Sequence, residues 1–154
     1  MIIRIFLSIV FSIFITSCGF SPIYSGNLKN VTIAKSEIVG EKNLTFDLER
    51  KLNFTKDEKS PNSYVFKAQI FDSTETSVVD FRGIPTEEII RLTVTYQFED
   101  KNNVIIYQDS VAKDKRISVS DNISNNNLVK SNEKKLLLDS VVQNILFKSR
   151  VVLK

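Results

Sequence analysis

The feature of this sequence that most constrains its fold is a strict alternation of apolar and polar side chains over residues 90–98. The apolar members of this run are Ile90, Leu92, Val94, Tyr96 and Phe98. Because successive side chains of a β-strand point to opposite faces, the pattern predicts a strand, Glu88–Phe98, with one buried face. A polar turn at 99–103 follows, and the aliphatic segment Val104–Ala112 returns, so the two strands form a β-hairpin.

Two further strands are predicted upstream of this hairpin. The first is Val31–Val39, which ends at Gly40. The second is Tyr64–Phe71, which alternates and runs on through residues 74–79 until the segment 80–85 (Asp-Phe-Arg-Gly-Ile-Pro) breaks it. Residues 113–120 are charged and then β-like. The segments 55–63 and 121–127 are polar and are predicted to be loops.

Helical periodicity occurs in two segments. Residues 41–54 carry leucines four positions apart, Leu44, Leu48 and Leu52, and Asn43 is a candidate cap for this helix. Residues 131–152 predict a closing helix with four core-facing side chains, Leu138, Val141, Val142 and Ile145. The element order is therefore β-α-β-β-β-α. This order favours a single α+β domain in which two helices pack on one face of a four-stranded, mainly antiparallel sheet.

The N-terminus has the organisation of a bacterial lipoprotein signal. A basic residue, Arg4, precedes an apolar run at 5–15, and two small residues then precede Cys18. The sequence Ile-Thr-Ser-Cys resembles the lipobox, in which the cysteine receives the lipid. We therefore expect a cleaved signal peptide at 1–17, a lipidated tether at 18–30 and one domain at 31–154. Lipobox processing attaches several acyl chains, which gives durable anchoring.

Two alternatives compete with this interpretation of Cys18. One is an uncleaved N-terminal membrane anchor, although the apolar run is shorter than the roughly 20 residues that a spanning helix needs. The other is an ordinary cleaved signal in which Cys18 is incidental. Cys18 is the only cysteine of the chain, and it stands where a lipobox places its cysteine. These two facts favour lipidation, which also leaves no thiol for a disulfide within the chain.

Composition argues against most catalytic and nucleic-acid-binding roles. The chain has no histidine and no cysteine besides Cys18, so the commonest general base and the common soft metal ligands are missing. We therefore expect no enzymatic activity, no metal and no cofactor. The net charge of +3 is too small to predict nucleic-acid binding by itself.

The residues that follow the cysteine carry a family resemblance. Cys18-Gly19-Phe20-Ser21-Pro22-Ile23-Tyr24 resembles the Cys-Gly-Phe-x-Pro-Leu-Tyr that opens many mature lipopolysaccharide-assembly lipoproteins of the LptE family, of the alphaproteobacterial type. Ile23 departs mildly from that pattern. The order of elements also matches the family, whose fold is two helices on a four-stranded sheet. Residues 91–96, followed by a polar turn and a second aliphatic strand, look like the family's central hairpin.

The resemblance implies a non-enzymatic role in the outer membrane, with the domain on the periplasmic side. Proteins of this family sit as a plug inside the LptD barrel, help it to fold and contact lipopolysaccharide during its insertion into the outer leaflet. The alternatives are a small subunit of another envelope complex, such as one for outer-membrane protein assembly, or a soluble-lipid carrier. A carrier needs an enclosed apolar cavity, whereas the alternation predicts a filled, one-sided sheet.

Basic residues are the expected partners of lipopolysaccharide, which presents phosphates and carboxylates. Two groups are candidates: Arg82 in the 80–85 segment, and Lys113, Lys115 and Arg116 after the hairpin's return strand. The alternative is a solvated strand edge, where lysines discourage aggregation between sheets. The aromatic residues Phe20 and Tyr24 either pack on a partner or membrane interface, or fold back on the domain.

Overall fold

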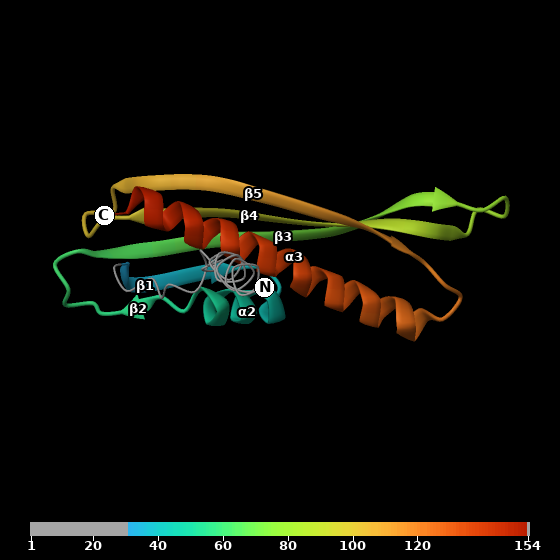
Figure 1. The fold of residues 1–154 in the computed structure, drawn as a ribbon, viewed down its shortest axis with the longest axis horizontal. Helices are drawn as coiled ribbons and strands as arrows, with labels where there is room; N and C mark the ends of the chain where they lie inside the picture. The colour runs from blue at the N-terminus through green and yellow to red at the C-terminus, as the bar shows by residue number, and fades with distance from the viewer. Residues whose placement is uncertain (1–30, 154) are drawn as a thin grey trace, which may run out of the picture.

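The computed structural model describes residues 31–153, which form one sheet covered by two helices (Figure 1). The elements in chain order are β1 (Thr32–Val39), α2 (Lys42–Leu52), β2 (Thr55–Lys56), β3 (Ser63–Val79), β4 (Pro85–Glu99), β5 (Ile105–Ser118) and α3 (Ile123–Val152). The expected α+β class with two helices is confirmed. The predicted signal peptide, the tether and Cys18 lie outside the described residues.

The sheet has five strands in the order β2-β1-β3-β4-β5 and is mixed. The expectation of four strands missed β2, a two-residue strand inside the segment predicted to be a loop. The expectation of a mainly antiparallel sheet was also too simple, because β1 pairs in parallel with both β2 and β3. Helix α2 returns the chain to the end where β1 began, so β3 starts beside the start of β1 and runs in the same direction.

The three longest strands form an antiparallel meander. Pairing of β3 with β4 extends from Val65↔Glu99 to Val79↔Pro85, and pairing of β4 with β5 extends from Glu87↔Ser118 to Glu99↔Ile105. Figure 1 shows the β3–β4 hairpin continuing past the helices at one end of the molecule. We call residues 78–85 at that end the hairpin tip.

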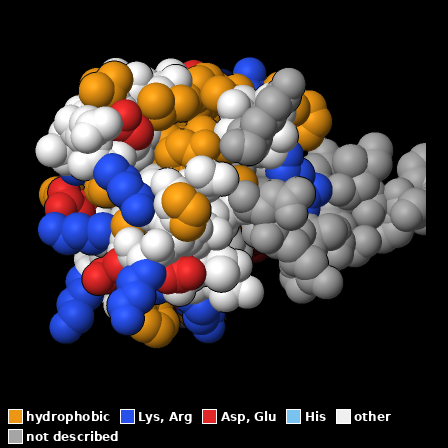
Figure 2. Space-filling view, turned by 90° about the vertical axis from the view of Figure 1, so that its left-hand side faces the viewer, with side chains coloured by type: hydrophobic (Ala, Val, Ile, Leu, Met, Phe, Trp, Pro, Cys, Tyr) orange, Lys and Arg blue, Asp and Glu red, His pale blue; other side chains and the backbone are white. Residues whose placement is uncertain are grey.

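The opposite end of the molecule, which we call the base, consists of the turn at 100–104, the first residues of β5 and the last two turns of α3. The start of β1 lies at this end as well, because Thr32 pairs with Ser63, at the start of β3. Figure 2 shows the base face-on. The hairpin tip and the base are thus separated by the length of β4, whose 15 residues span about 50 Å.

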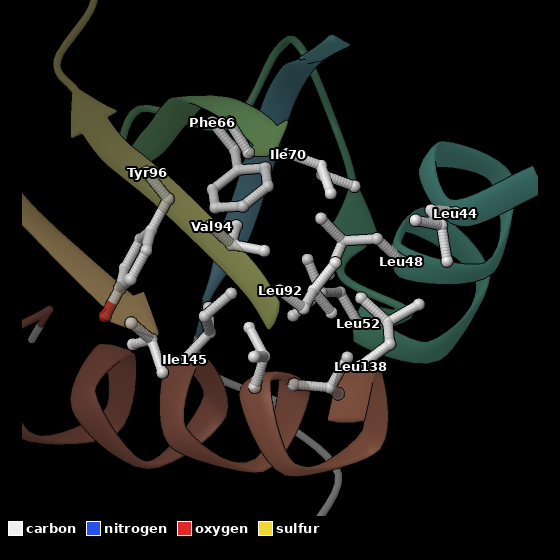
Figure 3. Close-up of a cluster of buried hydrophobic side chains, with 14 of the residues drawn as sticks. Leu44, Leu48, Leu52, Phe66, Ile70, Leu92, Val94, Tyr96, Leu138 and Ile145 are labelled. Atoms are coloured by element: carbon white, nitrogen blue, oxygen red, sulfur yellow. The ribbon is translucent and has the colours of Figure 1, made fainter. Parts of the chain in front are cut away.

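The core lies between the helices and one face of the sheet (Figure 3). Strand β4 contributes the five side chains predicted from its alternation, and all five are buried. The three leucines of α2 and the four predicted residues of α3 are buried against them. Aromatic rings close the base end of this core: Phe66 packs against Phe54, Tyr96 and Phe98 with ring centroids 5.1–6.3 Å apart.

Both helices begin differently from the prediction. Helix α2 starts after Glu41, which makes no side-chain cap bond, so Asn43 lies inside the helix and is not its cap. Helix α3 begins at Ile123, within the segment predicted to be a loop. Asn122 caps it by accepting a hydrogen bond from the backbone N–H of Asn125. This cap, together with the hydrogen bonds between Asn126 and Ser120, stabilises the start of a helix in a segment poor in helix formers.

Salt bridges fix α3 against the rest of the domain. Lys134 pairs with Asp72 of β3, and Lys130 pairs with Glu88 of β4 at 2.6 Å. Lys51 of α2 pairs with Asp139. Because Lys130 and Lys134 are one helical turn apart, they attach the same face of α3 to two neighbouring strands. These contacts set the position of the helix beside the sheet.

Gly40 is required by close packing between the end of β1 and β3. A Cβ at Gly40 would stand 2.8 Å from Ile70 Cβ and 3.0 Å from the Ile70 carbonyl oxygen, and its φ of 151° disfavours other residues. We expect Gly40→Ala to lower the free energy of unfolding by about 2–3 kcal/mol, because strand backbone must move. Chemical denaturation of the two proteins measures the difference.

Gly83→Ala is the matched control for this prediction. Gly83 also has a positive φ, 80°, but a Cβ there meets nothing within 4 Å. We therefore expect Gly83→Ala to lower the free energy of unfolding by about 1 kcal/mol, through backbone strain alone. Equal losses of stability in the two variants would show that close packing at Gly40 has no effect.

Candidate functional site

The hairpin tip presents apolar side chains to solvent on an ordered turn. Phe81 is 96% exposed, the highest value among the large hydrophobic side chains of the described residues. Val78, Val79 and Ile84 beside it are each about half exposed. An exposed cluster of this kind at the end of a projecting arm is typical of a surface that contacts another molecule.

Asp80 organises the tip. One carboxylate oxygen, Oδ1, accepts the backbone N–H groups of Arg82 and Ile84 at 2.8 and 2.9 Å. The Asp80 backbone N–H donates to the Ile84 carbonyl oxygen at 2.8 Å, and Gly83 N–H donates to the Asp80 carbonyl oxygen. Gly83 supplies the left-handed residue that such a turn requires. Phe81 is therefore held outward by a hydrogen-bonded turn.

Arg82 packs against its neighbours in the same turn. Its Nε donates to Asp80 Oδ2 at 2.9 Å, and its guanidinium lies 5.5 Å from the centre of the Phe81 ring. The cation therefore covers part of one ring face while most of its side chain stays exposed. A terminal guanidinium nitrogen also lies 2.9 Å from Asp80 Oδ2, so the tip combines an exposed aromatic ring with an arginine that is paired to a carboxylate of its own turn.

The same turn occurs at the other end of β4. The Asp100 carboxylate accepts the N–H groups of Asn102 and Val104 at 2.8 and 2.9 Å. Asn103 takes the place of Gly83, with a φ of 60°. Strand β4 is thus bounded by two equivalent turns, each with an aspartate at its start and a left-handed residue three positions later.

Protonation of these aspartates is expected to loosen both turns. The hydrogen bond from the Ile84 N–H lowers the pKa of Asp80 below its ordinary value of 3.8, and that from the Val104 N–H lowers the pKa of Asp100 in the same way. The ionised form stabilises each turn above the unfolded-state pKa, and this stability is lost as pH falls through the lower folded-state pKa. NMR titration of the Ile84 and Val104 amides should give midpoints below 3.8.

Asp80→Asn is the control for this titration. The amide oxygen still accepts both N–H groups but carries no titrating charge. In this variant the Ile84 amide should stop responding to acid, while Val104 continues to titrate. A Val104 midpoint at or above 3.8 in the parent would contradict the proposed role of the Asp100 carboxylate.

The three predicted basic residues of β5 do not lie on one face. Lys113 pairs with Leu92 and Lys115 with Ile90, so both side chains share the helix-covered face of the sheet, on its edge strand β5. Arg116 pairs with Ile89 and lies on the open face, where it contacts Glu87 at 3.5 Å. The three residues therefore do not form one site.

Arg82 and the β5 cations are also separated along the sheet. Strand β5 ends opposite Glu87, whereas Arg82 lies in the turn beyond the start of β4. Sequence analysis singled out Arg82 but missed Phe81 next to it. The repeated pattern of Asp followed three positions later by Gly or Asn, Asp80–Gly83 and Asp100–Asn103, could have identified an ordered turn that exposes Phe81.

A polar cleft lies between the start of α2 and α3, with a volume of about 680 Å³. Its lining includes Lys42, Lys130, Lys134 and Lys135. Two of these lysines are paired, Lys130 with Glu88 and Lys134 with Asp72 and Glu41. Because Glu41 and Asp47 also line the cleft, it carries charges of both signs.

No group of three acidic, cysteine or histidine side chains in residues 31–153 could hold a metal ion. Neither of the helices described there combines the length and apolarity needed to cross a bilayer.

Comparison with known proteins identifies the fold. No protein-family model matches the chain, and no curated protein matches its sequence. Three similar solved structures are a minor lipoprotein of Acinetobacter baumannii, an uncharacterized lipoprotein B of Nitrosomonas europaea and a rare lipoprotein B of Shewanella oneidensis. Their TM-scores are 0.57, 0.56 and 0.52, and their sequence identities are 17%, 15% and 14%.

The alignments cover most of each chain. They span 76%, 79% and 76% of this chain and 88%, 87% and 93% of the respective structures. At these identities the likeness establishes a shared fold. These three solved structures are all named lipoproteins.

Proposed function

We propose that this chain is an outer-membrane lipoprotein, anchored through Cys18, that acts as the plug and assembly partner of the LptD barrel during lipopolysaccharide transport. The observation that carries the proposal is the hairpin tip, an exposed apolar end with an Asp80–Arg82 ion pair, held on a long arm of paired strands. A plug must reach through a lumen and engage its partner far from its own anchor. The arm provides this reach, and the turn at Asp80 holds Phe81 outward.

Three further observations support the proposal. The residues Cys18–Tyr24 resemble the opening of the mature LptE family. Solved structures with this fold are named lipoproteins. The open face of the sheet carries polar side chains such as Thr93, Thr95 and Gln97, which suit a hydrated lumen better than lipid.

Co-purification tests this function. A C-terminally tagged full-length chain is expressed in its native host, membranes are solubilised in mild detergent, and captured proteins are identified by mass spectrometry. We expect a large outer-membrane barrel protein of the LptD type in near-stoichiometric amount. Recovery of inner-membrane partners only, or of a barrel from a different assembly complex, would refute the proposal.

A separate measurement tests the anchor. Metabolic labelling with an alkyne fatty acid should mark the full-length chain, and Cys18→Ala should abolish the label. Labelling that persists in Cys18→Ala would show that the lipid is attached elsewhere. Because this assay requires no barrel, the anchor and the partner can fail independently.

The predicted lipopolysaccharide contacts are Arg82, Lys113, Lys115 and Arg116. Because Lys113 and Lys115 share one face and Arg116 lies on the other, one bound molecule should contact only one of these groups on β5. We expect the double variant Lys113→Ala/Lys115→Ala to weaken binding of purified lipopolysaccharide severalfold, because two charge-assisted contacts are lost. Fluorescence titration with labelled lipopolysaccharide measures the change.

Arg116→Ala is the control on the opposite face. Its side chain contacts Glu87, so its loss should have the smaller effect on binding. If the double variant binds lipopolysaccharide as tightly as the parent, Lys113 and Lys115 do not contact it. Their role is then that of solvated lysines at a strand edge, which discourage aggregation between sheets.

A further inference from the structure

The base carries an exposed apolar surface on consecutive residues of one strand end. Val104, Ile105 and Ile106 are 55%, 50% and 46% exposed. The last turns of α3 end at the same end of the molecule (Figure 1) and contribute two further exposed hydrophobic residues, Phe147 and Val151. Figure 2 shows hydrophobic side chains gathered over the upper part of this end. These residues are far from the hairpin tip, so they form a second surface.

Basic residues accompany this apolar surface. Lys101, in the turn before β5, is exposed, and Lys148, in the last turns of α3, is partly exposed. The nearest acid in the turn, Asp100, uses its carboxylate to hold the Asn102 and Val104 N–H groups. Lys101 is therefore the exposed charge next to the apolar residues of β5, whereas the exposed acids Asp57 and Glu58 at this end lie in the loop after β2, which is at the opposite edge of the sheet. This combination matches a surface of anionic phospholipid, which offers headgroup phosphates above an acyl boundary.

The path of the chain also leads to the base. Val31 precedes β1, and the strand pairings place the start of β1, the start of β3 and the start of β5 at this same end. Only residues 19–30 separate Val31 from Cys18, a length that spans at most about 40 Å. A lipid on Cys18 therefore keeps the base within reach of the bilayer.

We propose that the base docks on the anionic phospholipid surface to which Cys18 is anchored, while the protein has not yet bound its partner. This inference rests on the lipid anchor of the proposed function, although not on the identity of the barrel. Because the anchor makes docking an intramolecular event, a few apolar and basic contacts suffice. Docking through the base keeps Phe81 out of the membrane and available to a partner.

Site-specific fluorescence on the acylated full-length protein tests this inference. Cys18 is the only cysteine, and acylation blocks its thiol, so a new cysteine takes the probe alone. Val104→Cys places an environment-sensitive probe at the base, and Phe81→Cys places one at the hairpin tip. Each protein is reconstituted in vesicles of phosphatidylethanolamine and phosphatidylglycerol, with and without brominated phospholipid as a quencher.

We expect the probe at 104 to shift to shorter wavelength and to be quenched by brominated lipid, whereas the probe at 81 responds to neither. Adding Ile105→Glu and Ile106→Glu should reduce the docked-to-free ratio at the base about tenfold or more, because two apolar side chains are replaced by charges that anionic lipid repels. The control Val78→Glu/Val79→Glu, at the tip, should leave the signal at 104 unchanged.

Three outcomes would overturn the inference. Equal quenching at 81 and 104 would mean that the domain lies flat on the membrane, and quenching at 81 alone would mean that the tip docks. A wavelength shift at 104 in detergent without vesicles, together with a doubled mass, would assign the base to contact between two copies of the chain. The assay contains no barrel protein, so failure of the co-purification experiment leaves its result intact.

Discussion

Phe66→Ala should lower the free energy of unfolding by about 3–5 kcal/mol, the usual cost of removing a fully buried aromatic ring. Phe66 has no exposed surface and lies 5.3 Å from Phe54 and 5.1 Å from Phe98 between ring centroids. The cavity left by the ring is bounded by strands on one side and by Phe54 on the other, so it cannot collapse without moving the sheet. Equilibrium denaturation of the full chain measures the loss.

Phe71→Ala is the matched control on the same strand. Phe71 lies five residues along β3 on the open face and is 54% exposed, so its truncation removes little buried area. We expect a change within about 1 kcal/mol. Similar losses for the two variants would mean that the open face of the sheet is buried in solution, and that the domain is covered by another molecule.

Phe81→Asp should reduce recovery of the barrel partner at least about tenfold, the effect of losing an aromatic hot spot at an interface. The side chain makes no buried contact within the described part of the domain, so the substitution should leave the unfolding transition unchanged. Quantitative mass spectrometry of the co-purified material measures recovery. The loss is expected without any fall in the amount of the variant itself.

Phe46→Asp provides the comparison for the tip variant. Phe46 is an exposed phenylalanine on α2, and its ring lies 5.9 Å from Arg50, much as Phe81 lies beside Arg82. It is not at the tip, so recovery of the partner should stay near the parental level. If Phe46→Asp is as harmful as Phe81→Asp, general surface hydrophobicity and not the tip governs the association.

The core could be predicted from the sequence because it depends on local periodicity. The alternation from Ile90 to Phe98 identified the buried face of β4, and the spacing of Leu44, Leu48 and Leu52 identified that of α2. Both patterns follow from backbone geometry that does not depend on distant residues. The hairpin was predicted for the same reason, since its turn lies between two patterned segments.

The features that were missed depend on contacts between distant segments or on capping. Strand β2 is two residues long, and it exists only because Thr55 and Lys56 meet the start of β1. The first turn of α3 is asparagine-rich and polar, and its helical state relies on the Asn122 cap. Intrinsic propensity therefore gave the wrong answer at that helix end.

The candidate site was predicted only in part. Arg82 was chosen for its charge, whereas Phe81 was passed over because the segment 80–85 was treated only as a break between strands. The sequence also suggested one cluster of three basic residues on β5, because Lys113, Lys115 and Arg116 are close in sequence. Successive side chains of a strand point to opposite faces, however, so Arg116 lies on the opposite face from the two lysines. Side chains that are adjacent in the sequence of a strand therefore do not share a face of the sheet.

The two equivalent turns that bound β4 have a consequence for how this arm can change in length. Each turn holds its strand pair in one register, and a shift by a single residue would exchange the buried and open faces. Apart from bulges such as those at Ser77 and Thr86, residues can therefore be added to or removed from the β3–β4 arm only in matched pairs, one pair on each strand. Such paired insertions beyond the helices would lengthen the arm and carry Phe81 outward with its turn intact. Related chains could thereby fit partners of different depth while keeping the same core.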